Sequence, residues 1–153
     1  MAKKKIIRTE TPAVGYDWTF TFGDGRVIRR KNYIPDIGLQ TLAALVNGEY
    51  TNPAIYLALG TGTTANATGT TLLATEGFRT AISSKSRQLA VWRMRFFMRE
   101  SEAVGTWEEF AVFIAGTTVA DSGQMLNRLV ETVSKTSSTN LTVEVKLTFA
   151  RSA

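Results

Sequence analysis

Apolar and polar residues alternate with a period of two along most of the chain, and this pattern predicts β-strands. The clearest case is residues 141–149, where every second residue is apolar and the residues between them are polar. The same kind of pattern predicts further strands at residues 54–59, 78–83, 88–99, 106–115 and 125–133. Because short polar turns join most of these segments, we expect mostly antiparallel pairing.

Residues 16–30 have the pattern of a β-hairpin. Trp18, Phe20 and Phe22 alternate with polar residues, and a Gly-Asp-Gly turn at 23–25 follows them. Asp-Gly favours such turns because both residues tolerate positive φ at low cost. We therefore expect two short antiparallel strands in this segment.

One segment has helical rather than strand periodicity. An apolar stripe at i, i+3, i+4 and i+7 predicts a helix of about three turns from Asp36, ending near Asn47-Gly48. The stripe consists of Leu39, Leu42, Ala43 and Val46. This face is expected to pack against the rest of the fold.

These elements predict a mainly β fold: an antiparallel β-sandwich or barrel-like domain with one short helix and an extended N-terminal arm. Residues 1–33 are interpreted as the arm with its hairpin, and residues 34–153 as a β-rich body domain. A chain of 153 residues is long enough for one domain with its own core. The serine- and lysine-containing stretch at 84–86 is expected to be a turn.

Charge is unevenly distributed along the chain. Residues 1–33 contain eight Lys or Arg residues and three acidic residues, so they account for the whole formal net charge of +5. The remaining 120 residues are balanced in charge, because they hold ten basic and ten acidic residues. Such asymmetry suggests that the N-terminal segment binds a partner.

The composition argues against an enzyme. The sequence contains no cysteine, so it has no thiolate. It also contains no histidine, which is the commonest general base and metal ligand. The adjacent Glu108 and Glu109 would point to opposite faces of a strand, and the glycine–threonine segment at 60–64 lacks phosphate-loop spacing and is expected to be a mobile connection. We expect no catalytic, cofactor or metal site.

Basic and aromatic residues are the candidates for partner binding. Arg93 and Arg95 should point away from the core in their strand and suit ion pairs with a neighbouring subunit. Apolar residues interrupt the charges of the arm, which favours a protein partner over a nucleic acid. The arm candidates are Lys3, Lys4, Lys5, Arg8, Arg29, Arg30 and Lys31 as charged contacts, and Trp18, Phe20, Phe22 and Tyr33 as apolar anchors.

From Tyr33 onward the chain resembles a family of bacteriophage virion structural proteins, over about three-quarters of its length. The resemblance rests on the segment after the helix, Ile55-Tyr-Leu-Ala-Leu-Gly-Thr-Gly-Thr-Thr-Ala65, together with a series of later motifs. Those motifs are Leu72-Leu-Ala-Thr-Glu-Gly-Phe-Arg79, Glu109-Phe-Ala-Val-Phe113, Gly123-Gln-Met-Leu-Asn-Arg128 and Leu141-Thr-Val-Glu-Val-Lys-Leu-Thr-Phe149. The nearest likeness is to capsid decoration (cement) proteins with a β-tulip-type domain.

This resemblance implies a protein that binds the outer shell of a phage head and stabilises it. Its implied partners are the major capsid protein and further copies of itself, as a homotrimer whose arms contact neighbouring trimers. Its implied location is the capsid exterior, after synthesis in the host cytoplasm. No apolar run is long enough to cross a membrane, so no membrane partner is expected.

Two alternatives remain open at the level of sequence. The first is a tail or baseplate component of the same fold. The second is a nucleic-acid-binding protein that uses the basic arm, whose binding would weaken steeply with salt.

Overall fold

A computed structural model describes residues 12–32 and 34–151 of the chain. Within these residues it contains nine β-strands and one α-helix. The elements are β1 (Pro12–Phe22), β2 (Val27–Lys31), α1 (Asp36–Val46), β3 (Ile55–Gly60), β4 (Glu76–Ala81), β5 (Ser84–Gln88), β6 (Val91–Met98), β7 (Gly105–Ile114), β8 (Gln124–Lys135) and β9 (Leu141–Arg151).

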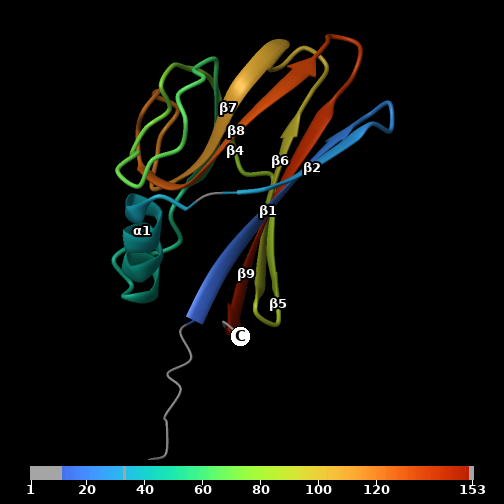
Figure 1. The fold of residues 1–153 in the computed structure, drawn as a ribbon. Helices are drawn as coiled ribbons and strands as arrows, with labels where there is room; N and C mark the ends of the chain where they lie inside the picture. The colour runs from blue at the N-terminus through green and yellow to red at the C-terminus, as the bar shows by residue number, and fades with distance from the viewer. Residues whose placement is uncertain (1–11, 33, 152–153) are drawn as a thin grey trace, which may run out of the picture.

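The strands form two antiparallel sheets that face each other, as a sandwich (Figure 1). The five-stranded sheet has the order β2-β1-β9-β6-β5, and the four-stranded sheet has the order β4-β3-β7-β8. The structure therefore confirms the predicted mainly β, antiparallel sandwich with one short helix. Residues 1–11 of the predicted arm lie outside the described residues.

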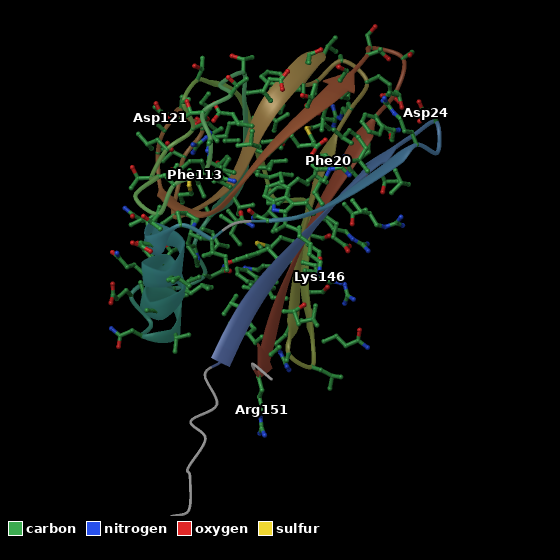
Figure 2. All side chains as sticks on the ribbon, viewed as in Figure 1. Phe20, Asp24, Phe113, Asp121, Lys146 and Arg151 are labelled. Atoms are coloured by element: carbon green, nitrogen blue, oxygen red, sulfur yellow. The ribbon has the colours of Figure 1, made fainter. Side chains whose placement is uncertain are left out.

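The main core lies between the two sheets. Period-two alternation aims one side of each strand at the opposite sheet, and these inward side chains are buried. Phe20 of β1 meets Phe110 of β7 edge to face, with ring centroids 4.9 Å apart, and Figure 2 shows Phe20 in this interior. Burial of such aromatic rings is a large part of what holds the sheets together.

The N-terminal hairpin is confirmed, but it is not separate from the body. β1 pairs with β9 along its whole length, from Pro12 opposite Arg151 to Phe22 opposite Leu141. Residue 33 therefore marks no break in the sheet, because β1 and β2 are two of its five strands.

Helix α1 forms where expected but buries a different face. Gly38, Thr41 and Leu42 are buried, whereas Leu39 and Val46 of the predicted stripe are exposed. The reason is a close approach to β8, since a Cβ at position 38 would collide with the carbonyl oxygen of Leu126. Hydrophobic periodicity does not reveal such a contact, because its key residue is a glycine.

The strand and turn between residues 84 and 90 are exchanged relative to the prediction. Ser84–Gln88 is not a turn but the edge strand β5, which pairs with β6. The turn is Leu89-Ala90, inside the segment predicted as one long strand. All five side chains of β5 are exposed, so no apolar alternation marks it as a strand.

The outer face of the four-stranded sheet has its own cover. Helix α1 and the connection between β3 and β4 lie on this side, as Figure 1 shows. A second apolar cluster is buried beneath them, in which Leu73 and Ile37 pack on Phe113 and its neighbours. The described part of the molecule thus has three layers: the five-stranded sheet, the four-stranded sheet, and the cover formed by α1 and the β3–β4 connection.

Candidate functional site

The outer face of the five-stranded sheet is rich in cations, and none of the described elements covers it. The strand register places two rows of charged residues across it. In one row Lys31 lies opposite Asp17, Asp17 opposite Lys146, and Lys146 opposite Arg93. In the second row Arg29 lies opposite Thr19, Thr19 opposite Glu144, and Glu144 opposite Arg95.

We call this surface the basic face. It is defined by Arg29, Lys31, Arg93, Arg95 and Lys146 together with Asp17 and Glu144.

Local strand geometry explains why these residues share a face. Each is next in sequence to a residue that points into the core, for example Asp17 beside Trp18 and Lys146 beside Val145. Since successive side chains of a strand point to opposite faces, burial of the aromatic set forces the charged set outward. Lys146 is labelled in Figure 2, on the side away from the four-stranded sheet.

The charges of the basic face are only partly neutralised. Glu144 lies 2.7 Å from Arg95 Nε and 3.9 Å from Arg93 Nε, and Lys146 Nζ lies 3.4 Å from Asp17. Exposed ion pairs of this kind contribute only about 0–1 kcal/mol to stability. Five cations and two carboxylates leave a net charge of +3 on one side of the sheet.

The structure brings four predicted partner-binding residues together and adds one. Arg29 and Lys31 from the hairpin meet the same surface as Arg93 and Arg95 from β6. Lys146 is not among the predicted partner-binding residues, although the alternating pattern of residues 141–149 puts it on the polar side of that strand. Only the strand order, which sets β9 between β1 and β6, brings it beside the other cations.

The predicted apolar anchors are wrong for the described part of the chain. Trp18, Phe20 and Phe22 are buried in the core of their own domain. They cannot contact a partner there without opening the sandwich. The alternating pattern predicts the hairpin but not the sheet that it joins. In the structure the apolar side of β1 is the inner side of that sheet.

Arg30 also has a different role from the one predicted. It lies opposite Trp18 and so points to the inner side, where its Nε lies 2.6 Å from Glu131 of β8. This pair joins the edges of the two sheets. The remaining candidates lie outside the described residues; they are Lys3, Lys4, Lys5, Arg8 and Tyr33.

A second cluster of charge is fully buried. Glu109 of β7 and Arg128 of β8 form an ion pair of 2.8 Å. The Glu109 carboxylate also accepts hydrogen bonds from the backbone N–H groups of Gly62, Ala74 and Thr75. The segment around Gly62, predicted to be a mobile connection, is instead held in place by buried Glu109.

The pKa of Glu109 reflects two opposing effects. Burial acts to raise this pKa, whereas hydrogen bonds from Arg128, Thr75 and Ala74 lower it, and the net pKa lies below the ordinary glutamate value. The carboxylate is therefore charged and fully paired near neutral pH. This arrangement suits a structural role, because both carboxylate oxygens accept hydrogen bonds from the loop backbone and Oε2 also accepts one from Arg128.

Residues 12–32 and 34–151 contain no group of three or more Asp or Glu side chains placed to hold a metal ion. Over the same ranges no helix is long and apolar enough to cross a membrane. The chain was also compared with protein-family models, with curated proteins and with solved structures, and none of the three comparisons found a match. The basic face is therefore the candidate site on geometric grounds alone.

Proposed function

We propose that this chain is a non-enzymatic virion building block, a decoration protein that binds the outer shell of a bacteriophage head. The observation that supports it best is the basic face, a broad, uncovered surface with a net charge of +3. Such a surface suits an acidic neighbour, since complementary charge speeds encounter and fixes the register of docking. The sequence resemblance to phage decoration proteins supplies the identity of that neighbour.

Docking would depend mainly on Arg93 and Arg95, which project from one strand. Arginine presents a planar fork of donors that matches a carboxylate, so it suits ion pairs across an interface. Arg29 and Lys31 would extend the contact at the far edge of the sheet. In this proposal the protein acts as a homotrimer on the major capsid protein, with residues 1–11 adding contacts to neighbouring trimers.

Location on the particle is the direct test. Phage particles purified from a lysate that produces this chain would be labelled with an antibody against it and examined by electron microscopy. We expect label over the heads. Label over the tail would favour the tail or baseplate alternative, and a chain found only free in the lysate, absent from particles, would refute the proposal.

A charge-reversed variant tests the basic face itself. In Arg93→Glu/Arg95→Glu the face would hold three cations and four carboxylates, and we expect it to fold but to be lost from particles. Undiminished incorporation of this variant would mean that the basic face does not dock.

Nucleic acid is the competing partner for a basic surface. A gel shift with duplex DNA at two salt concentrations separates the two, because phosphate contacts lose affinity steeply as salt rises. Tight, salt-sensitive binding to DNA together with no association with particles would favour the nucleic-acid alternative.

A further inference from the structure

The inner face of the five-stranded sheet continues beyond the sheet that covers it. Along β9 the inward residues Val145 and Leu147 are completely buried, but the next inward residue, Phe149, is 45% exposed. On the neighbouring strand Met94 is buried and Trp92 only half-buried. Figure 1 shows this end of the sheet, with the end of β9 and the β5–β6 turn, extending past the four-stranded sheet. At this end the apolar inner face of the sheet therefore extends beyond the elements that cover it within residues 12–32 and 34–151.

The turn at this end has an unusual residue. Leu89 begins the two-residue connection between β5 and β6 with φ of 51°, and it is 86% exposed. Two-residue hairpin turns favour Asn, Asp or Gly at such positions, because a positive φ crowds a larger side chain. Leucine is thus unfavourable here both for the backbone and for solvation, and strain of this kind is characteristic of functional positions.

Leu89 borders an open groove of about 350 Å³. The groove is lined by Arg87, Leu89, Ala90, Val91, Trp92 and Phe149. Five of these six residues are apolar, and the sixth, Arg87, donates a hydrogen bond of 2.8 Å to the carbonyl oxygen of Leu89. We call this surface the hairpin groove.

We propose that the hairpin groove binds an extended acidic segment of a partner protein, with one apolar side chain inserted beside Leu89 and carboxylates flanking it. The inference rests on the proposed function, since it names the chemistry of the segment that the neighbouring subunit presents. The groove offers Trp92 and Arg87, two residue types that are enriched in interface hot spots. The inserted side chain would complete the core that Phe149 leaves open.

Charge decides between the occupants. Arg87 lines the groove, and Lys85 lies on the same side of β5, because Arg87 pairs with Trp92 and Lys85 with Met94, both inward. A second copy docked groove to groove would bring these cations against each other. Residues 1–11 contain four basic residues and one acidic residue, so they are also mismatched. An acidic segment neutralises this rim and is favoured over both.

The test uses the full chain labelled with ¹⁵N and three heptapeptide probes. One probe alternates Glu and Leu, the second replaces Leu by Ser, and the third replaces Glu by Lys. We expect the amide signal of Leu89 and the indole signal of Trp92 to shift with the Glu/Leu peptide only. Absence of shifts at these signals, or an equal response to the Lys/Leu peptide, overturns the proposal.

Variants separate recognition from folding. Leu89→Asn should weaken binding of the Glu/Leu peptide about tenfold and leave the melting temperature equal or higher, because Asn accepts the positive φ. Phe149→Thr should weaken binding similarly and covers the case in which the turn variant folds poorly. The matched control is Val119→Asn, which removes another exposed apolar side chain, 67% exposed, in the loop before β8. Unchanged affinity in both groove variants contradicts the proposal.

Other occupants give distinct results. Concentration-dependent self-association that Leu89→Asn abolishes would assign the groove to a second copy. Peptide binding that appears only after residues 1–11 are removed would assign it to that segment. Failure of the proposed function is separable as well. In that case the chain is absent from particles while the groove still binds the acidic peptide, whereas particle binding by Leu89→Asn at the wild-type level refutes the groove alone.

Discussion

The two sheets of the sandwich differ in what covers their outer faces. The four-stranded sheet is covered by α1 and by the connection between β3 and β4, which bury Phe113 and its apolar neighbours. No described element covers the outer face of the five-stranded sheet, where cations outnumber carboxylates. Within the described residues, one sheet is therefore covered on its outer face and the second is not.

Arginine–glutamate pairs occur on both sides but act differently. Arg128 and Glu109 are buried and hold the loop that covers the four-stranded sheet. Arg95 and Glu144 are exposed on the basic face. Burial decides the outcome, because removing one partner leaves a costly unpaired charge in the interior but only a hydrated one at the surface. The same type of ion pair therefore fixes a buried loop on one face and stays exposed to solvent on the other.

The largest expected effect comes from breaking the buried pair. Arg128→Met leaves Glu109 charged and unpaired, and we expect a loss of about 3–5 kcal/mol in the free energy of unfolding. Chemical denaturation measures it. Arg95→Met is the matched control at the exposed pair, with an expected loss under about 1 kcal/mol. Equal losses in the two variants would show that burial does not separate the two faces.

The contact between helix and sheet gives the next effect. In Gly38→Ala the added methyl meets the carbonyl oxygen of Leu126, and we expect a loss of about 1–3 kcal/mol. Alanine is the better helix former, so helix propensity alone predicts a gain. Gly69→Ala, where the added Cβ meets nothing within 4 Å, is the control. A higher melting temperature for Gly38→Ala would mean that α1 does not seat closely on β8.

Acid should remove the stabilising contribution of Glu109 on the covered face. The pKa of Glu109 is lowered in the fold, so its charged form stabilises the native state. That contribution is fully present above the ordinary glutamate pKa of 4.5 and is lost as pH falls through the lowered folded pKa. We therefore expect the stability gap between wild type and Glu109→Gln to be constant above pH 5 and to narrow below pH 4.5. Thermal melts from pH 7 to pH 3 measure it, and a gap that stays constant throughout contradicts this role.

Sequence predicted the architecture of this fold better than its surfaces. The period-two pattern identified the sandwich and the outward positions of Arg93 and Arg95, because alternation depends only on local strand geometry. It failed at β5, where both sides are exposed and no alternation exists. It also failed for Trp18, because inside and outside depend on which strand lies alongside, and the β1–β9 pairing joins opposite ends of the chain. The basic face and the hairpin groove both depend on that long-range pairing.

The smallest effect on stability tests the basic face from the opposite direction. Glu144 holds Arg95 and lies near Arg93, so Glu144→Gln should release both arginines and raise the net charge of the face from +3 to +4. We expect a stability loss below about 1 kcal/mol and, unlike most substitutions at an interface, tighter binding to an acidic probe such as polyglutamate. The gain should shrink between 50 and 200 mM salt, because exposed charges are screened.

Glu131→Gln is the control that makes this result specific. Glu131 has almost the same side-chain exposure as Glu144, 23% against 24%, and its arginine lies at 2.6 Å rather than 2.7 Å. Both variants remove one negative charge from the chain, but Glu131 pairs with Arg30 between the sheets and not on the basic face. If total charge governs binding, the two variants will bind polyglutamate equally. If the basic face governs it, only Glu144→Gln will bind more tightly, because only there are the freed arginines beside further cations on an uncovered sheet.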